Sequence, residues 1–168
     1  MNECKPSENN WTKVAVFAGG DRGHYRTDFD CFVGVDRGSL WVLEEKLPLA
    51  LAVGDFDSVT VAERKLIHAR AQHFVQAQPE KDDTDLELAL LTIFEKNPQA
   101  QVTIFGALGG RIDHMLANVF LPSNPKLAPY MRQIAIEDGQ NLIAYCPEGT
   151  SQLEPRSDYD YLAFMPVR

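Results

Sequence analysis

The sequence predicts an α/β fold in which helices cover both faces of a parallel sheet, followed by a smaller all-β region. Two observations lead to this prediction. Short, uniformly apolar runs alternate with helical patterns through the first 121 residues, and strands that are apolar throughout are typical of parallel sheets buried on both faces. Beyond residue 125, three strand-like runs follow with no helical pattern between them, which indicates a change of architecture.

Five buried strands are expected in the first part of the chain, at Lys13–Ala18, Cys31–Val35, Leu49–Val53, His73–Gln76 and Val102–Phe105. Leucines at helical spacing follow the second strand. The sequences Thr60–Glu63 and Thr84–Glu87 are capping boxes, which predict that helices begin there. The second of these helices should end near Asn97, before a proline. A further helix is expected from about Asp113 to Leu121.

The chain is expected to divide into an α/β domain at residues 1–125 and the start of an all-β domain at residues 126–168. The second part contains strand-like runs at residues 133–137, 142–146 and 161–165, and Asp138-Gly139 between the first two is a hairpin signal. Three strands make a poor independent sheet. The all-β domain is therefore expected to be incomplete in this sequence.

Composition excludes several classes of function. The 168 residues carry a formal net charge of −8, which argues against binding to nucleic acid or to an anionic membrane through bulk electrostatics. No apolar run approaches the length of a membrane span, and Met1–Asn10 lacks the apolar segment of a secretory signal. Three widely spaced cysteines without a CxxC motif argue against zinc and a disulfide framework. A cytoplasmic location is therefore expected.

Carboxylates gather at two places where a parallel sheet binds ligands, outside the carboxyl ends of its strands. Asp55 and Asp57 follow the third strand, and alternation along an extended chain should point them the same way, with Phe56 directed toward the core. Alone, such a pair is as often a solvated turn. With further carboxylates nearby, it predicts a Mg²⁺ site, since Mg²⁺ prefers oxygen ligands. The spacing of a Ca²⁺-binding EF-hand is absent.

The second acidic group, Asp82-Asp83-Thr84-Asp85, lies at a helix start. Acidic residues favour that position by about 0.3–1 kcal/mol through the helix dipole. Capping accounts for one of these side chains, but three exceed what capping needs. We therefore expect Asp82 and Asp85 to share a face and to join the metal site.

Glycines follow the fifth strand, in Gly106–Gly110, and Arg111, Asp113 and His114 come next. Glycines before a helix let the backbone approach an anion, and a guanidinium suits phosphate. The alternatives are a plain strand-to-helix turn, Asp113 as the N-cap, and His114 as a structural hydrogen bonder. Neither a Walker A loop nor a Rossmann fingerprint is present.

Asp36 and Arg37 follow the second strand. The carboxylate of Asp36 could reach the same metal or bond a sugar or water, or it could simply be a turn residue that caps the next helix.

Three motifs together resemble the thiamine pyrophosphokinase family. They are Gly54–Ser58, the Lys-Asp-x-Thr-Asp-Leu-Glu-Leu-Ala-Leu run at 81–90, and the Gly-Ala-Leu-Gly-Gly-Arg-x-Asp-His-x-x-Ala-Asn run at 106–118. The resemblance implies a catalytic α/β domain, a C-terminal β-sandwich and a homodimer with thiamine bound between subunits. The implied reaction is ATP plus thiamine giving AMP plus thiamine diphosphate, with Mg²⁺. One departure is Arg37, where the family commonly has glycine, which bears on the shape of that loop.

The resemblance also implies roles for single residues. Metal ligands would be Asp55, Asp57, Asp82 and Asp85, with Asp36 a weaker candidate. Catalytic residues would be Asp57, Asp85, Arg111 and Asp113. Substrates would contact Asp36, Arg37, Ser58, Arg111, Asp113 and His114. Two other functions stay open: a non-catalytic sensor of thiamine or nucleotide, and a metal-dependent phosphohydrolase. The many mutually repelling carboxylates argue against a mere binder.

Overall fold

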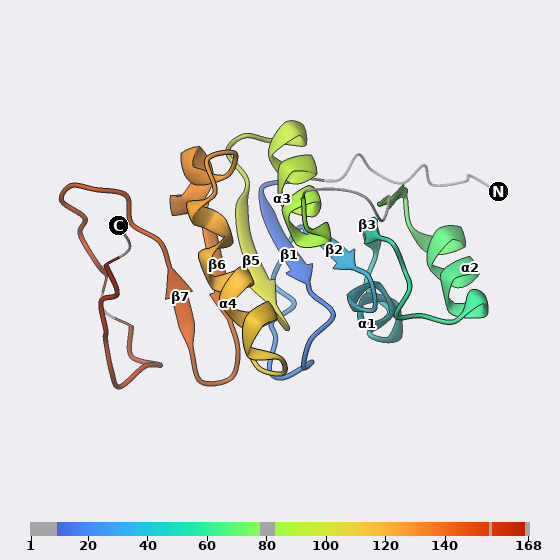
Figure 1. The fold of residues 1–168 in the computed structure, drawn as a ribbon, viewed down its shortest axis with the longest axis horizontal. Coiled ribbons are helices and arrows are strands. Elements are labelled where there is room, and N and C mark those ends of the chain that lie inside the picture. The colour runs from blue at the N-terminus through green and yellow to red at the C-terminus, as the bar shows by residue number, and fades with distance from the viewer. Residues whose placement is uncertain (1–9, 78–82, 155, 167–168) are drawn as a thin grey trace.

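The computed structural model describes residues 10–77, 83–154 and 156–166. Its centre is a seven-stranded sheet in the order β4-β3-β2-β1-β5-β6-β7 (Figure 1). The strands are β1 (Lys13–Phe17), β2 (Cys31–Val35), β3 (Leu49–Gly54), β4 (His73–Gln76), β5 (Gln101–Phe105), β6 (Ile134–Glu137) and β7 (Leu142–Ala144). The pairs from β4 across to β6 are parallel, and β7 is antiparallel to β6. The predicted parallel sheet is confirmed.

The helices begin and end close to the predicted positions. They are α1 (Gly38–Glu44), α2 (Val61–Arg70), α3 (Asp85–Lys96) and α4 (Ile112–Phe120), with short 3-10 helices η1 (Leu121–Ser123) and η2 (Ala128–Gln133). Successive residues of β1 enter opposite faces of the sheet: Val14 and Val16 pack in the core that α3 covers, whereas Ala15 and Phe17 pack in the core that α1 and α2 cover. Helices therefore lie on both faces.

The last part of the chain differs from the sequence-based expectation. Strand β6 pairs in parallel with β5, and Ile134 and Ile136 are buried in the same core as Ile104. The predicted hairpin is present, because β7 pairs back on β6 around Asp138-Gly139. Both strands thus extend the central sheet and do not open a second one. They join it because their apolar side chains complete its core.

The segment expected as a third strand at residues 161–165 contains no strand. Its side chains are exposed, and that of Tyr161 is 94% accessible. A strand needs a neighbour that supplies its backbone hydrogen bonds, and this segment pairs with none of the described strands. A separate β-sandwich domain is not seen among the described residues and stays a prediction.

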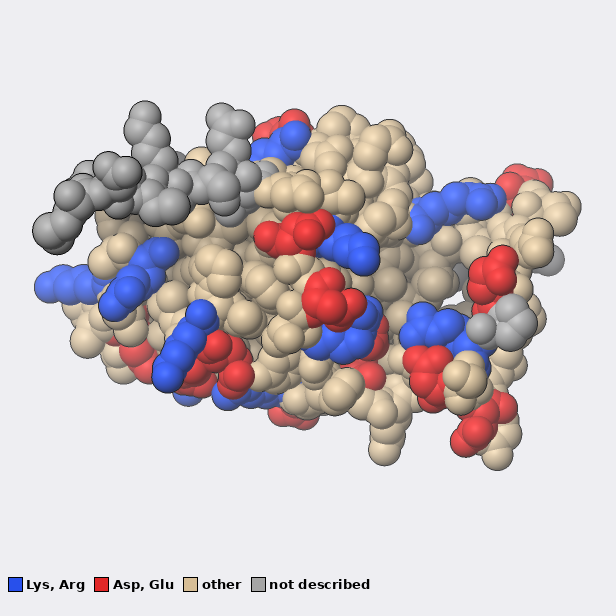
Figure 2. All heavy atoms as spheres, turned by 180° about the vertical axis from the view of Figure 1, so that it is seen from behind, with Lys and Arg blue, Asp and Glu red and all other residues tan. Residues whose placement is uncertain are grey.

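The surface agrees with the acidic composition. On the face shown in Figure 2, most basic side chains lie beside acidic ones. Ion pairs among the described residues include Arg22–Glu44 and Arg26–Glu137. Across the described ranges, no helix has the length and apolar character needed to cross a bilayer.

Candidate active site

Three carboxylates from three separate segments meet at the carboxyl edge of the sheet. Asp36 follows β2, Asp55 follows β3 and Asp85 is the first residue of α3. One oxygen of each lies within 4.8 Å of the others, and all three side chains are half-buried. They converge because parallel strands end at the same edge and α3 begins there. Such a set can hold a hard divalent cation.

The local backbone forces Asp36 and Asp55 together. The Asp36 carboxylate accepts a hydrogen bond from the Phe56 backbone N–H at 3.1 Å. Asp36 and Phe56 both have positive φ, at 48° and 59°, which costs about 1–2 kcal/mol for a residue other than glycine. A Cβ on Gly54 would lie 2.0 Å from an Asp36 oxygen. Only glycine therefore fits where the two loops cross.

The three carboxylates repel one another, so the protonated form of Asp36 is favoured. Burial, together with the Asp85 and Asp55 charges and a hydrogen bond with Asp85, raises the pKa of Asp36 to about 7, against the N–H of Phe56, which lowers it. A carboxyl beside other carboxylates keeps its proton to reduce repulsion. A divalent cation would take the place of that proton.

Asp57 lies outside this group of three. Its side chain is exposed, and its backbone N–H donates to the Asp55 carboxylate at 2.9 Å. The left-handed conformation of Phe56 turns the chain, so the alternation expected of an extended strand does not apply there. Phe56 itself is buried, as expected. Asp82 lies outside the described residues, so its predicted role is not tested.

The loop after β2 accommodates Arg37 without strain. Arg37 has helical dihedrals, φ −59° and ψ −25°, at the start of α1, so no glycine is needed at that position. Its guanidinium donates to the Ser58 carbonyl oxygen at 3.4 Å. Arg37 therefore links the loops that follow β2 and β3, and Ser58 is exposed beside it.

The glycine loop after β5 leads into α4, as predicted. Asn118 on α4 donates to the Ala107 carbonyl oxygen at 3.0 Å, and the backbone N–H of Gly20 donates to the Gly106 carbonyl at 3.1 Å. These two bonds fix the loop from both sides. Gly106 has φ +69°, a conformation that favours glycine.

Arg111 and Asp113 pair with each other at the start of α4. Their side chains are joined at 2.5 Å and are 69% and 61% exposed. This pairing lowers the pKa of Asp113. The N-cap of α4 is Arg111, and Asp113 is the second residue of the helix, so the N-cap alternative for Asp113 is wrong. His114 is exposed.

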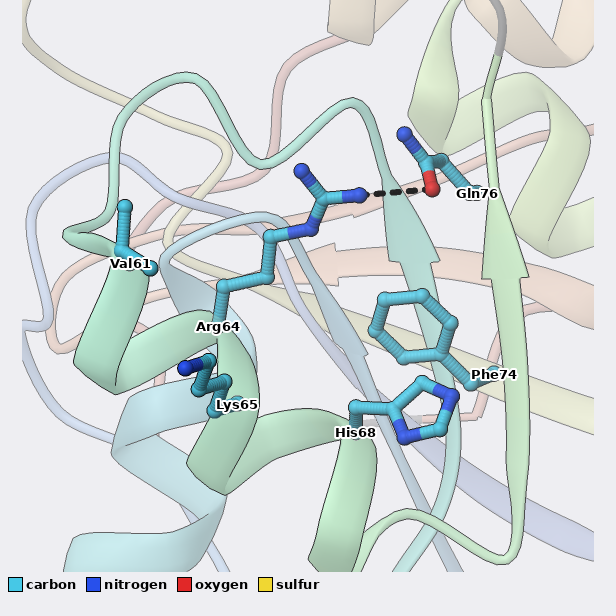
Figure 3. A pocket seen from close by; sticks show the side chains of 6 residues that line it. All are labelled: Val61, Arg64, Lys65, His68, Phe74 and Gln76. Carbon is cyan, nitrogen blue, oxygen red and sulfur yellow. Dashed lines mark hydrogen bonds between the residues drawn. The ribbon is translucent and has the colours of Figure 1, made fainter.

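A groove of about 590 Å³ lies between α2 and β4 (Figure 3). It is lined by Val61, Arg64, Lys65, His68, Phe74 and Gln76, none of which was predicted as a site residue. The Arg64 guanidinium donates to the Gln76 amide oxygen at 2.6 Å. The rings of Phe74 and Phe56 stack with their centroids 4.8 Å apart. Because Phe56 directly follows Asp55, this region supports the loop that carries Asp55.

Sequence reasoning missed a polar group behind the start of α3. Glu87 is only 4% exposed, and its carboxylate accepts from the Asn124 amide at 3.0 Å. Burial, with the nearby Asp83 charge, raises the pKa of Glu87 against the opposing effect of Lys126. The helical period could have revealed it, because Glu87 is in line with the buried Leu90 and Phe94.

Comparison with known proteins agrees with this geometry. A family model described as the catalytic domain of thiamin pyrophosphokinase matches residues 23–131. The thiamine pyrophosphokinase of Bacillus subtilis is 36% identical over 159 residues, covering 91% of this chain and 73% of that protein.

Solved structures give the same relationship. A thiamin pyrophosphokinase family protein from Enterococcus faecalis superposes with a TM-score of 0.78 at 46% identity, over 82% of this chain and 67% of that one. The thiamin pyrophosphokinase of Geobacillus thermodenitrificans has a TM-score of 0.61 at 35% identity, over 78% and 61%. The chain thus spans about three fifths to three quarters of the length of these relatives. On the family match and the B. subtilis similarity together, the chain belongs to the thiamine pyrophosphokinase family of diphosphokinases.

Proposed function

We propose that this chain transfers the pyrophosphoryl group of ATP to the hydroxyl of thiamine, giving thiamine diphosphate and AMP. The observation that carries the proposal is the convergence of Asp36, Asp55 and Asp85 within 4.8 Å, in a chain of this family. Asp55 and Asp85 would hold Mg²⁺ directly. Asp36 would give up its proton to do so, and Asp57 and Asp82 would complete the acidic side of the site. Bound Mg²⁺ would neutralise charge on the phosphates.

The reaction needs alignment more than covalent chemistry. The thiamine oxygen forms a bond to the β-phosphorus while the bond from that phosphorus to the α-phosphate oxygen breaks, and AMP leaves. Arg111 would exchange its bond to Asp113 for one to phosphate, which frees the Asp113 carboxylate to accept the hydroxyl proton or to contact thiamine. Arg37 and Ser58 follow β2 and β3, and His114 is in the first turn of α4; all three would contact the substrates.

AMP release measured with ATP and Mg²⁺, with and without thiamine, tests this function. We expect AMP only when thiamine is present. A thiamine or nucleotide sensor would release no AMP, and a phosphohydrolase would release phosphate without thiamine. Asp55→Asn should reduce turnover by about 100-fold, and Asp57→Asn shows whether the exposed carboxylate also takes part. Asp160→Asn, on an exposed carboxylate elsewhere, is the control.

We also propose that the chain forms homodimers and works in the cytoplasm. Apolar side chains on α4 support the first proposal: Ile112, Leu116 and Phe120 are 70%, 44% and 41% exposed at a spacing of four residues, which places them on one face. A contiguous exposed apolar face commonly marks a protein contact. Light scattering coupled to size-exclusion chromatography measures the mass, and a monomer at all concentrations would contradict the dimer.

A further inference from the structure

A buried carboxylate with no place in the proposed reaction lies two residues after Asp85 of the acidic cluster. The side chain of Glu87 is 5% exposed and belongs to the face of α3 that carries the buried Leu86, Ala89 and Leu90. Burying a charge among apolar side chains is costly unless it is paired and hydrogen-bonded. Its presence therefore calls for a partner, and the structure supplies two.

Glu87 does not act as the sequence signature suggests. In a capping box the glutamate side chain returns to the backbone N–H of the N-cap residue. At α3 only half of the box forms: the Thr84 hydroxyl accepts from the Glu87 N–H at 3.2 Å. The Glu87 carboxylate instead accepts from the Asn124 amide at 3.0 Å and lies 3.8 Å from the Lys126 ammonium.

Lys126 also contacts the chain on the N-terminal side of the N-cap residue Thr84. Its ammonium forms an ion pair with Asp83, the residue before Thr84. Two side chains from the segment after η1 thus hold α3 on both sides of Asp85. That segment follows α4, which has Arg111 as its N-cap and Asp113 in its first turn. The contacts therefore join the segment bearing a predicted metal ligand to the segment bearing the predicted phosphate contact.

We propose that Glu87, through Asn124 and Lys126, is a positioning residue that holds Asp85 within reach of Asp36 and Asp55. The inference rests on the proposed function in taking these three carboxylates as the metal site. Partners that orient metal ligands without touching the ion typically change affinity or activity by about 10–100-fold when they are removed. A glutamate needed only for capping would bond to the Thr84 N–H, as Glu63 does at Thr60.

The test compares Glu87→Ala with Glu63→Ala, because each removes a glutamate from the third position of a helix. Mn²⁺ affinity is measured by electron paramagnetic resonance, and amide hydrogen exchange over residues 83–88 is measured in the metal-free protein. We expect Glu87→Ala to weaken Mn²⁺ binding about tenfold and to speed exchange there. Glu63→Ala should leave both unchanged. Glu87→Gln, which still accepts from Asn124, should recover most of the affinity.

Asn124→Ala and Lys126→Met remove the partners from outside α3, and they carry the test if Glu87→Ala does not fold. Each is expected to weaken Mn²⁺ binding at least threefold. Affinities within twofold of wild type in all folded variants would overturn the inference, as would an equal loss in Glu63→Ala or a wild-type chain that binds no Mn²⁺. A wild-type chain that binds Mn²⁺ but releases no AMP would refute the proposed function and leave this inference standing.

Discussion

Two helices of this chain begin with the same Thr-x-x-Glu signature and differ in what the glutamate does. At α2 the box is complete. The Thr60 hydroxyl accepts from the Glu63 N–H at 3.2 Å, and the Glu63 carboxylate accepts from the Thr60 N–H at 2.7 Å. At α3 the Thr84 half forms, but Glu87 bonds to Asn124. The start of α2 is exposed, and its capping hydrogen bonds are formed between residues of the same turn. The start of α3 is tied to the rest of the molecule, and it presents Asp85 to the acidic cluster.

The first residue after each cap gives the largest expected contrast. Asp85→Asn should reduce thiamine-dependent AMP release by about 100-fold, because it removes one of three converging oxygens. The fold should survive, since the substitution also relieves repulsion with Asp36. The equivalent position in α2 is Val61, which is 74% exposed, and Val61→Asn should leave activity within twofold. Comparable losses in both variants would mean that the effect is not specific to the cluster.

Removal of the N-cap hydroxyl should separate an effect on stability from an effect on Mn²⁺ binding. Thr60→Ala and Thr84→Ala each delete an N-cap bond and should lower the free energy of unfolding by about 1 kcal/mol. Only Thr84→Ala should also weaken Mn²⁺ binding, since it loosens the turn that carries Asp85. Urea unfolding gives the first quantity and titration with Mn²⁺ the second. If Thr60→Ala weakened metal binding equally, the two helix starts would not differ in function.

The sequence predicts the sheet, its helices and the edge where the site forms, because those depend on periodicity and apolar burial, which are local. It also predicts that Asp55 and Asp85 converge, as they do, but it does not rank the other carboxylates correctly. Asp36, held as the weaker candidate, is in the cluster of three, whereas Asp57 is outside it. The left-handed turn at Phe56 decides this, and it exists because Asp36 accepts the Phe56 N–H across two loops. A contact between residues 20 apart leaves no mark in a local pattern.

The same limit applies to the end of the chain. The strand character of β6 and β7 and the hairpin between them were predicted, but their partner was not. Ile134 and Ile136 complete the core beside β5, and an apolar alternation does not state which sheet edge it will cover. Three weak strands suggested a separate sheet because the open edge of β5 is not visible in the sequence.

The smallest expected effect is a difference in pH dependence between the two helix starts. Bonds from Thr60 lower the pKa of Glu63, so Glu63 stabilises the fold above its unfolded pKa of about 4.3 and this contribution is lost as the pH falls through the folded value. Burial raises the pKa of Glu87. The contribution of Glu87 to the free energy of unfolding is therefore largest below the unfolded pKa and is lost as the pH rises through the folded pKa.

The two glutamine variants should consequently change in opposite directions. Between pH 6 and 4 the stability deficit of Glu63→Gln against wild type should shrink, whereas that of Glu87→Gln should grow. Urea unfolding midpoints for wild type and both variants, measured at the same series of pH values, give the two differences directly and cancel the titration of all other groups. Parallel curves would show that the pKa of Glu87 is not raised relative to that of Glu63, and the expected contrast in pH dependence between the two helix starts would be wrong.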